Sequence, residues 1–146
     1  MAVTVKKIVL WRGEIENQPG VLAGVLKPLA EAGADLHVVM GYRYPGNETR
    51  AAIELYPAAT KKLAAAAQAA GLSPSGIPTL LVEGDNKPGL GHTIARVLGD
   101  AGINLGFLVT QVIGRKYSSV IGLANEEDAK KAASLIKKAV ATKKRK

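Results

Sequence analysis

Apolar and polar residues follow two similar series of strand-like and helix-like periods along this chain. The first series predicts, in chain order, a strand, a helix, two strands, a second helix and a short edge strand, over residues 3–14, 21–29, 34–44, 49–56, 58–70 and 72–77. The second series predicts a strand, a helix, two strands and a final helix, over residues 79–83, 90–101, 103–113, 117–124 and 126–140. The second series therefore repeats the first but lacks its last strand.

The two-residue period also predicts which side chains face a core. Val38, Met40, Tyr42 and Tyr44 form the more apolar set of the third segment, so we expect them on the core side of a sheet. The opposite face is then expected to be bare of helices but not very polar, because it would carry residues such as Val39, Leu108 and Val112. Another unit or a second chain is expected to cover part of that face.

This order of elements predicts an α+β fold. Right-handed crossovers that skip one strand give an antiparallel four-stranded sheet with both helices on one face, which is the ferredoxin-like βαββαβ arrangement. We expect two such units in tandem, residues 1–77 and residues 78–146, the second without a clear last strand. The missing strand leaves residues 79–83 with an unpaired edge, and this predicts a homodimer or a close pairing of the two units.

One corner sequence occurs in both series, between a strand and a helix. It reads Glu16-Asn17-Gln18-Pro19-Gly20-Val21-Leu22 and returns 69 positions later as Asp85-Asn86-Lys87-Pro88-Gly89-Leu90-Gly91. The first N–H groups of a helix lack intrahelical acceptors and lie at the positive end of the helix dipole. Each corner is therefore a candidate site for a small anion such as a carboxylate.

Composition narrows the classes of function. The 146-residue chain has no cysteine, which excludes a disulfide, a thiolate metal site and a thiol nucleophile. Its only histidines, His37 and His92, have no partner at ligand or relay spacing, so we predict no catalytic residue, no metal site and no cofactor. The sequence contains no signal-peptide-like or membrane-spanning apolar run, so a soluble cytoplasmic protein without a membrane partner is expected.

The net charge of +8 raises the alternative of a nucleic-acid-binding protein. Much of the excess lies in the last helix and in the tail Lys143-Lys144-Arg145-Lys146, which is typical of a solvated chain end. A ferredoxin-like sheet that binds RNA needs aromatic side chains on its open face. With Tyr42 and Tyr44 expected on the core side, we consider nucleic acid an improbable partner.

The two repeats resemble the ACT domain, the amino-acid-binding regulatory module of aspartate kinases and phosphoglycerate dehydrogenase. The resemblance rests on each corner together with a following Ala-Gly and a strand that begins Asp35-Leu36 or Asn104-Leu105. The two copies cover residues 6–141, so the closest likeness is to stand-alone tandem ACT proteins. The resemblance implies an amino-acid sensor, or a detached regulatory subunit of a metabolic enzyme.

The resemblance also implies positions for a ligand. In the family, effector amino acids bind near these corners, where two ACT units meet. In serine-responsive members, contacts fall on the corner Asn and on the Asn that opens the following strand, which here are Asn86 with Asn104 and Asn17 with Asp35. The histidine that those members carry before the corner is replaced by Ile15 and Gly84, which argues against serine as the ligand. The pair of Asn86 and Asn104 makes the second corner the favoured site.

The chemistry of the corners fits a free amino acid independently of the resemblance. Helix-start residues could hold its carboxylate through backbone N–H groups, and these are Gly20, Val21 and Leu22 or Gly89, Leu90 and Gly91, with Pro88 part of the second corner. Side-chain oxygens of Asn17, Asn86, Asn104 or Asp35 could accept from its ammonium group. A purely structural role remains open for each, because Asn17 and Asn86 also suit turns and Asp35 and Asn104 also suit strand starts.

Overall fold

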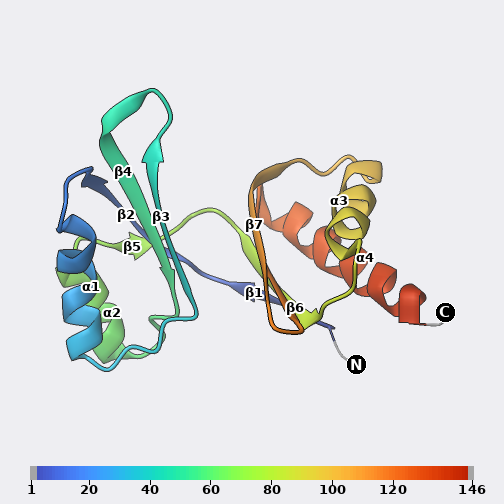
Figure 1. Cartoon of the computed structure of the whole chain (residues 1–146), viewed down its shortest axis with the longest axis horizontal. Coiled ribbons are helices and arrows are strands. Elements are labelled where there is room, and N and C mark those ends of the chain that lie inside the picture. Colours follow the sequence, from blue (N-terminus) through green and yellow to red (C-terminus); the bar gives the residue numbers. More distant parts are fainter. Residues whose placement is uncertain (1–2, 145–146) are drawn as a thin grey trace. The chain divides into compact units, whose positions relative to one another are not determined.

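The computed structural model of the protein describes residues 3–144, with side chains up to Val140. The described chain forms four helices and two antiparallel four-stranded sheets, so its fold class is α+β, as predicted (Figure 1). It divides into two compact units, one of residues 9–76 and one that combines residues 3–8 with residues 77–144. We call them the Asn17 unit and the Asn86 unit after their corners, and describe each by itself.

The Asn17 unit has the strand order β3-β4-β2-β5 with two helices on one face of the sheet. Its elements are β2 (Trp11–Glu16), α1 (Val21–Glu31), β3 (Val38–Tyr44), β4 (Asn47–Tyr56), α2 (Lys61–Ala69) and β5 (Ser73–Pro74). The helices and the sheet enclose a core of Trp11, Val25, Leu29, Ile53, Leu55, Ala58, Ala67 and Leu72. Helix α2 begins where the Thr60 hydroxyl accepts from the Leu63 N–H group at 3.1 Å, an ordinary N-cap.

The Asn86 unit has the strand order β1-β6-β8-β7. Its elements are β1 (Val3–Ile8), β6 (Thr79–Asp85), α3 (Leu90–Asp100), β7 (Leu105–Ile113), β8 (Lys116–Leu123) and α4 (Glu126–Lys144). The Asn125 side chain accepts from the Asp128 N–H group at 2.7 Å and so caps the N-terminus of the last helix. Residues of the two helices, such as Ile94 and Ile136, pack with Ile121 of the sheet in one core.

The prediction of one continuous strand over residues 3–14 is wrong. The chain forms two strands, and β1 pairs with β6 from Val3 opposite Gly84 to Ile8 opposite Thr79, whereas β2 pairs with β4 and β5. The first strand of the chain thus supplies the strand that the second series lacks, and the edge of residues 79–83 is covered. Lys7 of β1 also forms an ion pair with Glu126 at the start of α4. The unpaired edge, which motivated the predicted homodimer, does not exist.

The predicted faces of both edge strands are also wrong. Val39 lies opposite Leu55, and Leu108 lies opposite Ile121, so these residues share the face of the core side chains. Tyr42 lies opposite Ala52, on the face away from the helices. Val39 and Leu108 nevertheless remain exposed, because an edge strand extends beyond the helices that cover the centre of the sheet. In β3 and β7, the alternation of apolar and polar residues therefore does not identify the face that the helices cover.

Candidate functional site

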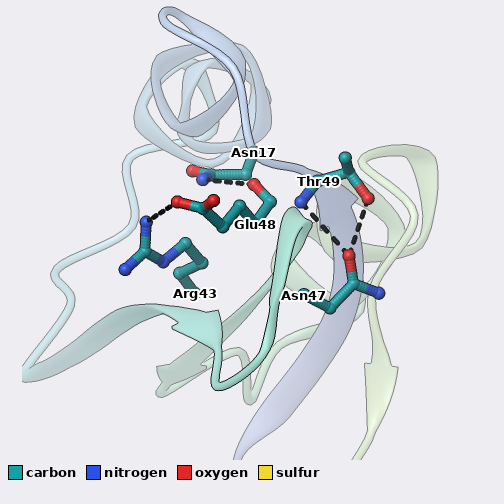
Figure 2. A network of polar contacts seen from close by, with 5 residues as sticks. All are labelled: Asn17, Arg43, Asn47, Glu48 and Thr49. Carbon is teal, nitrogen blue, oxygen red and sulfur yellow. Dashed lines mark hydrogen bonds and ion pairs between the residues drawn. The ribbon is translucent and has the colours of Figure 1, made fainter.

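The Asn17 corner is tied to the hairpin between β3 and β4. The Asn17 backbone N–H donates to the carbonyl of Thr49 at 3.0 Å, and its side-chain Nδ2 donates to the carbonyl of Glu48 at 2.8 Å. Figure 2 shows these residues with Arg43, whose guanidinium pairs with the Glu48 carboxylate at 3.0 Å. Asn47 closes the hairpin by accepting from both the N–H group and the hydroxyl of Thr49. The Nδ2 group of Asn17 is therefore structural, and its Oδ1 remains as the acceptor that a ligand could use.

Helix α1 begins directly after this corner. Gly20 has φ 88°, a left-handed conformation that glycine adopts without strain, and it starts the helix by accepting at its carbonyl from the Gly24 N–H group at 3.0 Å. No side chain caps this end of the helix. The Val21 N–H group donates to the carbonyl of Gln18 at 3.3 Å, and the N–H groups that follow it in the first turn have no side-chain acceptor. An anionic group at the corner would be stabilised by these N–H groups.

A pocket of about 190 Å³ opens beside the corner, between the start of α1 and the sheet. It is lined by Ile15, Glu16, Asn17, Gln18, Leu22, Gly41, Tyr42, Arg43, Ala51, Ala52 and Ile53. Ala51 lies opposite both Ile15 and Arg43 on the helix-facing side, and Gly41 lies opposite Ile53. Small residues at Gly41 and Ala51 leave this part of the sheet hollow, since a Cβ added at Gly41 would meet nothing within 4 Å.

Charged groups surround the apolar floor of this pocket. Glu16 and Asn17 lie on its rim, and both also border a second hollow of about 310 Å³ that Glu48, Thr49 and Arg50 help to line. The corner thus offers the amide oxygen of Asn17 as an acceptor, and the guanidinium of Arg43 with the α1 N–H groups as donors. This combination suits a zwitterion, which needs acceptors for an ammonium group and donors for a carboxylate.

The Asn86 corner repeats the backbone geometry but not the pocket lining. The Asn86 N–H group donates to the carbonyl of Arg115 at 2.8 Å, and Gly89 has φ 85°. The hydrogen bond from Lys116, at 2.8 Å, holds the pKa of Asp85 below its ordinary value. Leu90, the first residue of α3, is buried in the core, whereas Asn86, Pro88, Gly89 and Gly91 are exposed.

Neither predicted side-chain pair comes together within its own unit. Asn17 lies at the hairpin end of β4, beside Thr49, whereas the segment that holds Asp35 lies at the other end, where the His37 N–H group donates to the carbonyl of Tyr56. The seven residue steps from Thr49 to Tyr56 span roughly 23 Å of extended strand. Asp35 is exposed and contacts the His37 ring at 3.4 Å.

The Asn86 unit shows the same separation. The Asn86 corner bonds to Arg115, beside the turn between β7 and β8, whereas Asn104 precedes Leu105, which pairs with Leu123 at the far end of β8. Asn104 is exposed in the segment between α3 and β7. Within a single unit, each corner asparagine therefore acts without the second residue that the resemblance suggested.

Sequence reasoning missed a polar network on the face of the Asn17 sheet that lies away from its helices. The Tyr42 hydroxyl donates to Glu54 Oε2 at 2.8 Å, and Arg12 Nη2 donates to the Tyr44 hydroxyl at 2.8 Å. Glu54 is only 1% exposed, and its Oε1 has no hydrogen-bond partner. Burial, together with the bond to Glu54, raises the pKa of Tyr42.

This network changes the argument about RNA. Tyr42 and Tyr44 lie on the open face, so the reason for discounting a stacking surface was wrong. Their rings are tilted by 48° with centroids 6.3 Å apart, and both hydroxyl groups are engaged within the network. Glu14 lies on the same face and pairs with Arg50 at 3.5 Å, so the arginines here are partly neutralised by carboxylates. The face lacks the strong positive charge that RNA binding requires.

Neither the family models nor the curated proteins give a match to this chain. Solved structures do. A protein of Bacteroides thetaiotaomicron superposes with a TM-score of 0.70 at 17% identity, covering 93% of this chain and 98% of that one. The regulatory subunit of aspartate kinase from Thermus thermophilus gives a TM-score of 0.62 at 18% identity, over 94% and 95% of the two chains. The fold is that of tandem ACT domains.

A complete enzyme is also among the similar solved structures. The aspartate kinase of Clostridium acetobutylicum superposes with a TM-score of 0.59 at 14% identity, over 94% of this chain but only 34% of the kinase. This chain therefore corresponds in length to about a third of that enzyme. Among the described residues, no helix is long and apolar enough to cross a membrane.

Proposed function

We propose that this tandem ACT protein is a non-catalytic regulatory module that binds a free amino acid at the Asn17 corner. The observation that carries the proposal is the convergence of an uncapped helix start, the Asn17 side chain and an apolar floor on one pocket. Free amino acids present a carboxylate, an ammonium group and a side chain that diverge from one carbon atom. The three parts of the pocket offer a matching partner to each.

The proposed orientation follows from these partners. The carboxylate lies at the N-terminus of α1 and accepts from its first-turn N–H groups, near the guanidinium of Arg43. The ammonium group donates to Asn17 Oδ1. The ligand side chain then rests on Gly41 and Ala51, where a small or medium apolar group excludes water from the floor.

The Asn86 corner, which the sequence favoured as the ligand site, has a structural role in this proposal. Asp85 is engaged by Lys116, and Leu90 is buried, so Asn86, Pro88, Gly89 and Gly91 shape the start of α3 in this proposal. Asp35 and Asn104 lie far from the corners of their own units and contact no ligand there. Ligand recognition is thus assigned to Asn17, Gly20, Val21 and Leu22, with the floor of β3 and β4.

The regulatory role has two forms, a free amino-acid sensor and a detached subunit of a metabolic enzyme. The structural similarity to the regulatory subunit of an aspartate kinase supports the second form. We therefore propose a cytoplasmic subunit whose amino-acid ligand changes its affinity for an enzyme partner. Titrating the chain into a catalytic aspartate kinase domain, with and without amino acid, tests this form. Identical binding curves would leave only the sensor.

Thermal unfolding against a panel of the twenty common amino acids tests the binding proposal. An amino acid that binds only the folded protein raises the unfolding midpoint by mass action. At a concentration of one hundred times its Kd, the free energy of unfolding rises by about 2.7 kcal/mol. Gly41→Leu places a side chain on the pocket floor, at a position where an added Cβ meets no atom within 4 Å, so it should abolish the response. Gly24→Ala, on an exposed and open position of α1, is the matched control and should keep it. A panel without any response at millimolar concentration would refute the proposal.

A further inference from the structure

The two corners can be aligned residue by residue through one backbone hydrogen bond. In the Asn17 unit the corner amide donates to the carbonyl of Thr49, and in the Asn86 unit the corner amide donates to the carbonyl of Arg115. Two residues after each acceptor, the next side chain on the helix-facing side of the sheet is Ala51 in one unit and Tyr117 in the other. Tyr117 therefore stands where Ala51 forms the floor of the pocket.

The residues opposite Ala51 and Tyr117 differ in size, and the difference favours a larger side chain at Tyr117. Ala51 lies opposite Ile15 and Arg43, whereas Tyr117 lies opposite Gly84 and Val112. The absence of a side chain at Gly84 leaves room for a large neighbour across the strand pair. Space that is open in one unit is thus given to an aromatic ring in the other.

Tyr117 is buried as deeply as the aliphatic residues around it. It is 3% exposed and belongs to the same core cluster as Leu90 and Ile94 of α3. Its hydroxyl group is buried without a hydrogen-bond partner. A core position that needed only apolar volume would be met by Phe or Leu, so the unpaired hydroxyl marks a side chain in a cavity that was not shaped around it.

We propose that Tyr117 fills, from within the chain, the position that the ligand side chain takes in the Asn17 unit, so that the protein binds one amino acid per chain. The identity of the ligand rests on the proposed function, whereas the geometric part of the inference rests only on the positions of Ala51 and Tyr117. Tyr117 acts as a specificity-determining residue, because its ring decides which of two similar corners is open. The identity of residues 51 and 117, rather than that of Asn17 and Asn86, then distinguishes the two ACT units.

The geometric part is tested with p-cresol, which is the tyrosine side chain as a free molecule. Tyr117→Ala should leave a cavity of that shape, so p-cresol should raise the thermal midpoint of this variant and leave the wild-type midpoint unchanged. Tyr117→Leu serves in the same assay if the alanine variant does not fold. A folded Tyr117→Ala or Tyr117→Leu variant whose midpoint does not respond to p-cresol overturns the inference.

The functional part is tested by calorimetric stoichiometry with the panel amino acid that shifts the wild-type midpoint most. We expect one site per chain in the wild type, two in Tyr117→Ala and one in Tyr117→Phe, which keeps the ring. The reciprocal variant Ala51→Tyr should fill the pocket and lower the affinity at least tenfold, and Ala51→Leu repeats the test with less added volume. Two sites in the wild type would overturn the inference.

The two experiments separate failure of this inference from failure of the proposed function. If p-cresol binds the Tyr117→Ala variant while no amino acid binds the wild type, Tyr117 fills the corner, but amino-acid binding is refuted. If one amino acid binds the wild type while p-cresol has no effect on the variant, the Asn17 site stands and the role of Tyr117 falls. Each result thus addresses one claim.

Discussion

The Asn17 side chain donates to the main-chain carbonyl of Glu48 at 2.8 Å, and so fixes the hairpin of β3 and β4 to the start of α1. Glu48 therefore connects two groups of the corner, because its carbonyl accepts from Asn17 and its carboxylate pairs with Arg43. A ligand at the corner would therefore contact the Asn17 side chain, whose orientation depends on the hairpin. Changes at Asn17 are expected to affect both hairpin order and binding.

We predict that Asn17→Ala lowers stability by about 1 kcal/mol, the usual net value of one hydrogen bond, and removes the response to the amino-acid panel. Asn17→Asp keeps an acceptor oxygen but loses the donor to Glu48. It should therefore lose a similar amount of stability and retain part of the binding. Asn86→Ala, at the other corner, is the control for binding. Urea unfolding and thermal shifts measure the two effects, and equal loss of binding in both alanine variants would contradict the assignment.

Tyr117→Phe is predicted to be neutral or to raise the free energy of unfolding by about 1 kcal/mol, because it removes an unpaired buried hydroxyl while keeping the ring. Tyr117→Ala should instead cost about 3–5 kcal/mol, as is typical for loss of a buried aromatic side chain. Urea unfolding with a constant m-value distinguishes the two. A clear destabilisation by Tyr117→Phe would show that the hydroxyl makes a bond in solution.

Asp85 is predicted to make stability depend on acid pH. The hydrogen bond from Lys116 lowers the pKa of Asp85 in the folded state. The contribution of Asp85 to the free energy of unfolding is therefore present above the ordinary carboxyl pKa of about 4. The contribution is lost as the pH falls through the lowered folded-state pKa. Lys116→Gln should return the pKa of Asp85 toward its ordinary value, as measured by NMR titration of the side-chain carboxyl. An unchanged titration in that variant would exclude Lys116 as the cause.

Tyr42 is predicted to titrate above free tyrosine. Burial and the bond to Glu54 raise its pKa, so its contribution to stability is complete below about pH 10 and is lost as the pH rises through the higher folded-state value. Glu54→Gln removes the carboxylate charge and should bring the Tyr42 titration closer to the ordinary range. Ultraviolet titration, with Tyr42→Phe to assign the signal, makes the measurement. A titration that is the same with and without Glu54→Gln would leave burial alone as the cause.

The edge strand β7 is predicted to be the surface through which the chain forms a homodimer. Its nine residues carry no charge, and Leu108, Val109, Val112 and Ile113 are exposed on it. The opposite edge of the same sheet, β1, is protected by Lys6 and Lys7. An antiparallel pairing of two β7 strands therefore brings no like charges together.

Light scattering over a dilution series tests this assembly. The wild type should be a dimer, and Val112→Lys with Ile113→Lys should be a monomer of unchanged circular dichroism. Lysines at two exposed positions of β4, Glu48→Lys and Thr49→Lys, control for added charge. A dilute monomer of the wild type would refute the homodimer.

The periods and turn residues of the sequence were sufficient for the fold class and for most elements. Helix spacing located α1 and α3, because helix periodicity is a local property of the sequence. In the structure, Gly33 and Gly102 have positive φ after these helices, and Asn125 caps α4. The sequence could not show that residues 3–8 belong with the second series. Strand pairing joins distant residues, and Val3 and Gly84 carry no local signal for each other.

The repeated corner was also visible in the sequence, and its two asparagines make equivalent backbone bonds in the structure. What the sequence by itself determined is thus one complete βαββαβ pattern, a second without its last strand, and their Asn-x-Pro-Gly corners, since these follow from local conformational preference. Only the tertiary structure decided which corner has room for a ligand. That choice depends on Ala51 and Tyr117, because the volume beside a corner is set by side chains that reach it from another strand.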